Sequence, residues 1–403
     1  MKIHDTSTPV VLINCKLAAL GVMRSLGSLG VTTYGVDADS GSPAMLSRYC
    51  ADRFQMSLTA ENNSAFLEYL MNIGARLGRR AILIPTSDET SVFVAEHAET
   101  LIRHYIFPQN KPELVTALMH KKDMYYLAKH HNVPTACTEF PKSLSDVQTY
   151  VRKAVFPVMV KGILGNLLAL RTGVKMAIVH TPEELIETYK RLEDPASPNL
   201  MFQEYIPGGD DQIYIFNGYF NEGSECLAAF TGHKIRQFPV HVGCSSLGIC
   251  KWNKDVADIT TRFMKAVGYK GILDIGYRFD ARDGQYKVLD INPRIGQAFR
   301  LFLSNNGMDV ARALYQDLTG QKTLPIKPRE GRKWIIEDFD VVSSYHYYKE
   351  GSLTFGSWLK SFRGVEEGAW FSVRDPLPFL IMAGGLIKKY FVYMAKRLGL
   401  FKR

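Results

Sequence analysis

The chain has 403 residues, of which 46% are hydrophobic and 22% charged, a composition typical of a globular protein with two or three packed domains. Six cysteines and ten histidines show neither Cys-x-x-Cys spacing nor a metal-ligand pattern, which argues against a disulfide framework and a zinc site. The net charge of +9 suits an anionic ligand such as a nucleotide, or an anionic membrane surface. The basic residues are dispersed along most of the chain, so nucleic-acid binding is not predicted. We expect a cytoplasmic protein, because the polar N-terminus is unlike a signal peptide and no apolar run reaches the roughly 20 residues of a transmembrane helix.

The N-terminal part of the chain alternates between strands and helices. Residues 9–14 and 31–37 have the apolar pattern of buried strands, and residues 16–29 between them have helical periodicity. This βαβ order predicts a parallel sheet. Another strand is predicted over 81–85, and the polar run Thr86-Ser87-Asp88-Glu89 follows it, where open α/β sheets bind ligands. No Gly-x-Gly-x-x-Gly sequence is present here, so dinucleotide binding is not supported.

Two lysines mark the next segment. A single helix is predicted over 114–131, with Lys121 and Lys122 in its middle. A strand follows over 156–162 and closes on Lys161 and a glycine. A lysine at the end of a buried strand presents a compact cation, although it can also be an ordinary surface residue.

A glycine-containing loop and a second strand come next. The loop is expected over 165–175. The strand over 200–206 carries Gln203 and Glu204, and a Pro-Gly-Gly turn then leads into Asp210 and Asp211.

The acidic hairpin that follows is the most informative feature of the chain. Two alternating runs, 271–280 and 288–292, flank an Asp-Gly turn and predict antiparallel strands. Because side chains alternate along a strand, we expect one face to carry Asp274, Gly276, Arg278 and Asp280, and one face to carry Val288, Asp290 and Asn292. A carboxylate and a carboxamide two residues apart, followed by Arg294, would suit a magnesium–triphosphate site. The alternative is a polar strand end beside a turn.

The order of these segments resembles the ATP-grasp superfamily over about residues 1–320. The likeness is to uncharacterised ATP-grasp carboxylate–amine ligases, and more distantly to D-alanine–D-alanine ligase and carbamoyl-phosphate synthetase. It implies a mixed α/β and α+β fold, in which a Rossmann-like preATP-grasp domain precedes a two-lobed ATP-grasp fold and a C-terminal extension. The expected boundaries are 1–112 for the first domain, 113–200 for the small lobe, 201–328 for the large lobe and 329–403 for the extension.

The resemblance implies a nucleotide site. Lys161 would bind the α- and β-phosphates and Lys121 would be the second nucleotide lysine, with Lys122 as an open alternative. The residues from Glu204 to Ile206 would form the adenine hinge, and Asp210 or Asp211 would accept from the ribose hydroxyls. The full expected ATP-binding set is Lys121, Lys161, Gln203, Glu204, Tyr205, Ile206, Asp210 and Asp211.

The metal site departs from the family pattern. Asp290 stands where the family usually carries glutamate, and Asn292 would be its partner in holding Mg²⁺. The second acidic residue of the family falls near Gly276, which has no ligand. Asp280 is included in the predicted metal set, and Asp274 is the other carboxylate that could substitute.

Three basic residues are expected at the reacting end of the nucleotide. Arg294 would stabilise the transferred phosphoryl group. Lys234 and Arg236 lie two apart on an extended segment, so both are expected to point at one anionic group. The alternative for this pair is an exposed basic strand.

The resemblance implies an ATP- and Mg²⁺-dependent enzyme. A carboxylate would be phosphorylated to an acyl phosphate, which an amine would attack to give an amide; the substrates would be small metabolites or envelope precursors. Two alternatives remain: a regulatory or assembly protein that binds ATP but has lost catalysis, which Gly276 favours, and an enzyme that transfers phosphate without forming an amide.

The C-terminal tail has its own pattern. An apolar run over 378–387 is followed by the basic pairs Lys388-Lys389, Lys396-Arg397 and Lys402-Arg403, interleaved with aromatic and aliphatic residues. A basic, aromatic-rich amphipathic helix of this kind can lie at an anionic membrane surface. The alternative is a helix packed on the core or in a homodimer interface.

Overall fold

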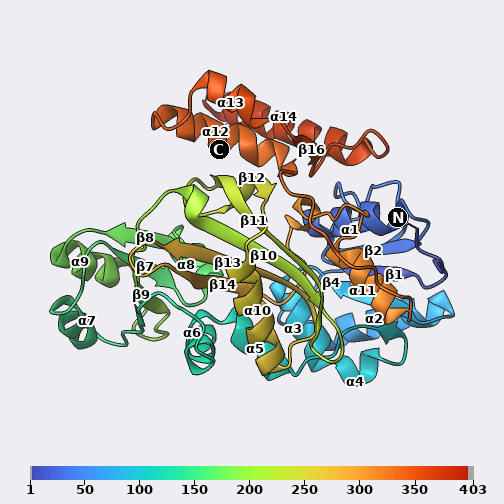
Figure 1. Cartoon of the computed structure of the whole chain (residues 1–403), viewed down its shortest axis with the longest axis horizontal. Coiled ribbons are helices and arrows are strands. Elements are labelled where there is room, and N and C mark those ends of the chain that lie inside the picture. The colour runs from blue at the N-terminus through green and yellow to red at the C-terminus, as the bar shows by residue number, and fades with distance from the viewer. Residues whose placement is uncertain (1, 398–403) are drawn as a thin grey trace.

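The computed structural model describes residues 2–397 and contains three β-sheets (Figure 1). The N-terminal sheet has the order β3-β2-β1-β4-β5, and all of its strand pairs are parallel. Its strands are β1 (Val10–Ile13), β2 (Thr33–Asp37), β3 (Cys50–Gln55), β4 (Ala81–Pro85) and β5 (Tyr105–Ile106). Its helices are α1 (Leu17–Gly27), α2 (Asn63–Leu77), α3 (Asp88–Glu96) and α4 (Ala98–Leu101). The apolar runs form strands because helices cover both faces, and every residue of β1 is buried.

The single helix predicted over 114–131 is two helices. They are α5 (Pro112–Met119) and α6 (Lys121–His130), and His120 between them has extended backbone angles. Lys121 therefore begins a helix instead of lying in the middle of one.

The small sheet has the order β6-β9-β7-β8 and is antiparallel. Its strands are β6 (Thr138–Glu139), β7 (Val158–Gly162), β8 (Met176–Val179) and β9 (Leu200–Glu204), and its helices are α7 (Leu144–Val151), α8 (Gly165–Thr172) and α9 (Pro182–Leu192). The loop predicted over 165–175 is wrong, because most of it is α8. The predicted lobe boundary after residue 200 falls inside β9, which pairs with β6 and β7.

The large sheet has the order β14-β13-β10-β11-β12-β15-β16. Its strands are β10 (Ile213–Phe220), β11 (Cys226–Phe238), β12 (Cys244–Cys250), β13 (Gly271–Asp280), β14 (Gln285–Asn292), β15 (Lys333–Ile335) and β16 (Val365–Gly368). The helices α10 (Lys254–Val267) and α11 (Val310–Leu318) pack on it, and two short 3-10 turns span Asp210–Gln212 and Phe299–Leu301. Phe216, Leu273 and Tyr277 belong to its buried core beside α10.

The predicted hairpin is confirmed, with one correction to its register. A bulge separates the pair Tyr277–Val288 from the pair Gly276–Asp290, so Leu289 is an extra residue on β14. Val288 is buried in the core beside Tyr277, whereas Asp290 is exposed on the other face. The prediction that Val288 and Asp290 share a face is therefore wrong.

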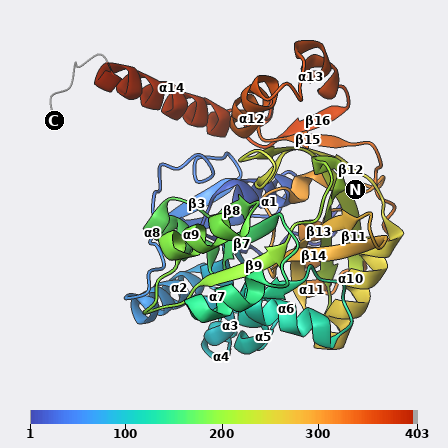
Figure 2. The same cartoon turned by 90° about the vertical axis from the view of Figure 1, so that its left-hand side faces the viewer.

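The C-terminal extension is joined to the large sheet by β15 and β16. Helix α12 (Glu337–Lys349) packs on β11 and β12, and α13 (Phe355–Ser361) follows it. Helix α14 (Leu377–Arg397) projects away from the body (Figure 2). Across residues 2–397, no helix is both long and apolar enough to cross a membrane. Leu398 to Arg403, which include the predicted basic pair Lys402-Arg403, lie outside the described residues.

Candidate active site

Lys161 lies at the end of β7 in a nearly closed environment. Its side chain is 9% exposed, and Nζ donates to Oε1 of Gln203 at 2.7 Å. Gln203 is oriented in turn, because its Nε2 donates to Oγ1 of Thr138 at 3.1 Å. Burial, together with the positive charge of Lys121, lowers the pKa of Lys161 to about 8. The ammonium group therefore has one neutral acceptor, the Gln203 amide, and could accept an anionic ligand.

Lys121 and Lys122 have different surroundings. The Lys122 ammonium lies over the ring of Phe140, 5.7 Å from its centroid. Burial lowers the pKa of Lys121, and the nearby carboxylates of Asp290 and Asp88 oppose this effect. A β carbon on Gly165, at the start of α8, would lie 3.6 Å from Lys121 Nζ. Helix α8 therefore reaches the lysine cluster.

The predicted adenine hinge is held in place by hydrogen bonds on both sides. The Glu204 N–H donates to the Cys137 carbonyl at 2.9 Å, and the Cys137 N–H donates to Glu204 Oε1 at 3.0 Å. The Ile206 carbonyl accepts from Arg278 Nε at 2.8 Å. Among residues 2–397 the Ile206 N–H has no hydrogen-bond partner, so it could donate to a base. Tyr205 lies between these fixed residues and is partly exposed.

The two aspartates after the hinge differ. Asp210 Oδ1 accepts from Gln237 Nε2 at 2.9 Å and lies 3.2 Å from His241 Nδ1, while Oδ2 accepts from the Tyr347 hydroxyl. Its oxygens thus bind the large lobe and α12. Asp211 is exposed, and its carboxylate contacts only the neighbouring Gln212 amide, at 3.3 Å, among the described residues. Asp211 is the freer of the two acceptors.

The predicted metal end contains two carboxylates and a carboxamide. Asn292 Nδ2 donates to Asp290 Oδ2 at 3.1 Å, and Asp274 is paired with Asn292 across the hairpin. A β carbon on Gly276 would lie 2.5 Å from Asp290 Oδ1, and one on Gly296 would lie 2.4 Å from Asp274 Oδ2. These two glycines make room for the two carboxylates.

The carboxylates affect each other electrostatically. Burial and the charge of Asp290 raise the pKa of Asp274 to about 6, against the opposing charges of Arg294 and Lys234. Within the described part of the chain, no group of three or more His, Cys, Asp or Glu side chains could hold a metal ion. The donor set still fits Mg²⁺, which prefers oxygen ligands and commonly completes its shell with phosphate oxygens and water.

Asp280, the other predicted metal ligand, does not join this group. It is buried at the far end of the hairpin, where Lys287 Nζ donates to it at 2.7 Å and Arg282 Nε at 2.8 Å. These partners, Arg282 first, hold its pKa well below the usual range. Asp280 lies four residues along β13 from Gly276, the partner of Asp290, which is roughly 13 Å of strand. The second carboxylate near Asp290 is Asp274.

Arg294 reaches both the metal end and the N-terminal domain. Nη2 donates to Asn292 Oδ1 at 3.2 Å, and Nε donates to Asp88 Oδ1 at 2.5 Å. Asp88 is the first residue of α3, just beyond β4. It was not assigned to the nucleotide site from the sequence, although the polar run after that strand was the available signal. Gly296 carried no comparable signal.

The predicted convergence of Lys234 and Arg236 on one anion does not occur. A bulge in β11 falls between them, so the simple alternation fails. Lys234 Nζ donates to the Gly243 carbonyl at 2.7 Å. Arg236 is buried, and its Nε and Nη2 each donate to Asp340 of α12 at 2.8 Å. Its guanidinium is a structural contact between the sheet and the extension.

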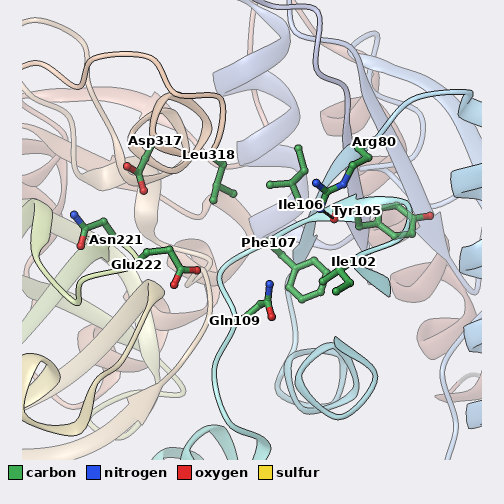
Figure 3. Close-up of a pocket in the computed structure, with 10 residues that line it drawn as sticks. All are labelled: Arg80, Ile102, Tyr105, Ile106, Phe107, Gln109, Asn221, Glu222, Asp317 and Leu318. Atoms are coloured by element: carbon green, nitrogen blue, oxygen red, sulfur yellow. Dashed lines mark hydrogen bonds between the residues drawn. The ribbon is translucent and has the colours of Figure 1, made fainter. Parts of the chain in front are cut away.

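A cavity between the N-terminal domain and the large lobe lies away from these residues (Figure 3). Its volume is about 360 Å³, and its lining includes Arg80 and Gln109 but none of the predicted site residues. Two acidic side chains on its wall are already engaged: Glu222 contacts Lys270 at 2.5 Å, and Asp317 accepts from the Tyr219 hydroxyl at 2.6 Å. This cavity gives no reason to move the candidate site.

Comparison with curated proteins finds ligases and synthases. Over 270 residues the chain is 23% identical to a D-aspartate ligase of Enterococcus faecium, covering 64% of each chain. Over 249 residues it is 23% identical to the large chain of carbamoyl phosphate synthase of Thermoanaerobacter, covering 58% of this chain and 22% of that one. The chain thus spans less than two thirds of the length of these relatives. No protein-family model matches it.

Solved structures share the architecture at low sequence identity. An N5-carboxyaminoimidazole synthetase of Staphylococcus aureus in complex with ADP has a TM-score of 0.64 at 11% identity, covering 87% of this chain and 88% of that one. An L-amino acid ligase of Bacillus licheniformis has a TM-score of 0.60 at 14% identity, with coverage of 82% and 79%. The biotin carboxylase domain of a Hydrogenobacter thermophilus carboxylase, bound to MgADP, has a TM-score of 0.62 at 15% identity, with coverage of 82% and 74%. Together with the three-sheet arrangement, these likenesses show that the chain has the ATP-grasp fold that its sequence predicts.

Proposed function

We propose that this protein is an ATP-dependent carboxylate–amine ligase that works through an acyl phosphate. The observation that carries the proposal is the convergence of Lys121, Lys161, Asp290 and Arg294 between the small and large sheets. The charge of Asp290 acts on both lysines, and the charge of Lys121 acts on Lys161. The charges of Asp290 and Arg294 both act on Asp274. The relatives that form carbon–nitrogen bonds, such as the D-aspartate ligase, support the same reaction class.

ATP would bind with its base at the hinge and its phosphates at the lysines. The Ile206 N–H would donate to adenine, and Asp211 would accept from the ribose. Lys161 and Lys121 would bind phosphate oxygens, which would replace the neutral Gln203 amide as the main partner of Lys161.

The residues that would hold Mg²⁺ are Asp290, Asn292 and Asp274. Bound there, the ion would neutralise charge that develops on the phosphates during transfer. Asp274 supplies the carboxylate that Gly276 lacks, and ionisation of Asp274 is unfavourable until a cation lies close to it.

Arg294 would stabilise the phosphoryl group as it moves. An oxygen of the carboxylate substrate attacks the γ-phosphorus, and the bond from that phosphorus to the β-phosphate oxygen breaks to release ADP. The amine nitrogen then attacks the acyl carbon, phosphate leaves, and the ammonium loses a proton to water. Asp88 would orient Arg294 from the N-terminal domain, through the 2.5 Å contact to Nε.

Lys234 lies on the same side as Asp274 and lowers the pKa of that carboxylate. It remains our candidate for binding the carboxylate or the acyl phosphate. Arg236 is not part of the proposal, because both of its donors to Asp340 are satisfied in a buried contact. A homodimer and a cytoplasmic location remain predictions from the sequence.

A second candidate is a protein that binds ATP without turning it over, which the absence of a carboxylate at position 276 favours. ADP formation, measured with Mg²⁺ and mixtures of amino acids and small carboxylic acids, separates the two. The ligase proposal requires ADP release that depends on both a carboxylate and an amine, and a product mass equal to their sum less water. Tight ATP binding with no ADP release under any mixture would favour the binding protein, and ADP release with a phosphorylated product alone would indicate phosphate transfer.

A further inference from the structure

Exposed apolar side chains are concentrated in the C-terminal extension. Of the 26 large hydrophobic side chains that are exposed among the described residues, 14 lie between residues 341 and 392. Monomeric globular proteins seldom expose such residues together unless the surface binds something. Helices α12, α13 and α14, which carry most of them, form a layer on one side of the body (Figures 1 and 2).

The two longer helices present these residues in different ways. On α12, Val341, Tyr345 and Tyr348 follow the i, i+4, i+7 spacing of one helix face, and the opposite face is buried on the large sheet. On α14, Leu380 is 59% exposed and Ile387 57% exposed, seven residues apart on one side of the helix.

The base of α14 is fixed to the N-terminal domain. Asp375, two residues before the helix, is buried and accepts from Arg24 Nε at 2.9 Å, from Ser47 Oγ at 2.8 Å and from the Arg48 N–H at 2.9 Å. Such a buried and fully paired carboxylate holds the start of α14 in one place. The contacts of Asp375 therefore fix the position from which α14 projects.

The positive charge of the C-terminal segment indicates what kind of surface α14 would bind. Residues 376–403 contain six lysines and arginines and no acidic residue, so this segment alone carries +6 of the net +9 of the chain. Two copies of such a segment would repel each other, which argues against a second copy of this chain as the occupant. Tyrosines beside a basic, apolar helix are typical of proteins that lie at the interface of a lipid bilayer.

We infer that α14, with the exposed face of α12, docks on the surface of an anionic lipid bilayer without crossing it. The apolar side chains would enter the boundary between headgroups and acyl chains, and the lysines would lie among anionic headgroups. This inference goes beyond the ligase proposal and does not depend on it, because its measure is protein bound to lipid and not ADP formation.

Vesicle flotation of the full chain tests the inference. Vesicles of phosphatidylcholine alone are compared with vesicles of equal parts phosphatidylcholine and phosphatidylglycerol, and only the mixed vesicles should carry the protein. Leu380→Glu with Ile387→Glu should weaken the partition by more than about a hundredfold, because two apolar side chains no longer enter the lipid. Lys388→Gln with Lys389→Gln should weaken it about thirtyfold on mixed vesicles, because each basic residue contributes about fivefold.

The control is Val155→Glu, which makes the same kind of change at a side chain that is 78% exposed in the small lobe. It should float like the parent. Thermal unfolding of each variant establishes that it is folded. The inference is overturned if the parent does not float, if the α14 variants float as well as the parent, or if neutral vesicles carry the parent equally well. It is also overturned if gel filtration shows a dimer that Leu380→Glu with Ile387→Glu dissociates and no vesicle carries the parent.

Discussion

Charged side chains are enclosed in two regions of the molecule, and they are paired in opposite ways. Between the large sheet and the C-terminal extension, Arg236 and Asp340 form a two-pronged contact with both N–O distances at 2.8 Å. At the candidate active site, Lys161 has a neutral amide as its partner, and Asp274 lies near a second carboxylate. The first region is complete within the chain, whereas the second keeps charges whose natural partners would be phosphates and a cation.

The pKa shifts express the same difference. Burial lowers the pKa of Lys161 to about 8 and raises that of Asp274 to about 6, so each group is less stable in its charged form than in water. Such shifts are typical of functional sites, where a ligand restores the missing interaction. We therefore attribute the contact between Arg236 and Asp340 to folding, and we propose ligand binding for the cluster of lysines and aspartates.

Of the substitutions considered, Arg236→Ala should lower the free energy of unfolding the most. Removing one partner of a buried ion pair leaves Asp340 unpaired, so we expect the free energy of unfolding to fall by about 3–5 kcal/mol. Urea denaturation measures it. The double variant Arg236→Met with Asp340→Leu should recover much of the loss, because neither charge is then buried alone. A variant that keeps its stability but loses ADP formation would return Arg236 to the active site.

Asp290→Asn should reduce activity and leave stability almost unchanged, in contrast to Arg236→Ala. The shape is kept and a ligand charge is lost, so Mg²⁺-dependent ADP formation should fall on the order of a hundredfold or more. The free energy of unfolding should change by less than about 0.5 kcal/mol, because the side chain is exposed. Asp283→Asn, at an exposed turn of the same hairpin, is the matched control and should leave ADP formation unchanged. Parental activity in the Asp290 variant would remove this carboxylate from the metal site.

The sequence predicted local features well and distant partners poorly. The Asp-Gly turn identified the β13–β14 hairpin, because turn chemistry is local. The bulge at Leu289, which moves Val288 to the core, has no signature that can be read from one strand. Arg236 looked like a site residue because its partner, Asp340, lies 104 residues further along the chain.

The same limit explains the metal ligands. Alternation along a single strand placed Asp274 and Asp280 on one face and gave no reason to choose between them. Arg282 and Lys287, which hold Asp280 away from the site, follow it in the chain, but their contacts depend on how the hairpin pairs. Gly296, whose missing side chain makes room for Asp274, belongs to a segment that lies beside β13 only in the folded protein.

Lys161→Ala tests the candidate active site through its affinity for ATP. Loss of a charged donor to a phosphate should weaken ATP binding by about 1.5–3 kcal/mol, measured by titration calorimetry. Lys122→Ala is the control, because that ammonium lies over Phe140 and should leave the affinity for ATP unchanged. The parent should also lose affinity as the pH rises through about 8, since deprotonation of Lys161 removes its charge, and the Lys161 variant should lack this step. An unchanged dissociation constant in the Lys161 variant would exclude it from the nucleotide site.

Asp274→Asn should change the free energy of unfolding less than Arg236→Ala does, and with the opposite sign. Its pKa in the folded protein is about 6, above the ordinary value of 3.8, so the folded state disfavours the ionised carboxyl. The cost to folding is absent below pH 3.8, grows as the pH rises, and is complete above about 6. At neutral pH the asparagine variant should therefore be more stable than the parent by about 1–3 kcal/mol, since one pKa unit corresponds to 1.36 kcal/mol. Thermal unfolding at pH 4 and pH 7.5 should show a small difference at the lower pH and a larger one at the higher pH.

The same variant should lose Mg²⁺-dependent ADP formation, because the carboxylate that weakens the fold is the one that would hold the ion. A variant that is no more stable than the parent at pH 7.5 would show that other groups in the chain stabilise the ionised Asp274. A variant that retains full activity would remove Asp274 from the metal site. Either result would contradict the contrast with the paired Arg236 and Asp340 at this residue.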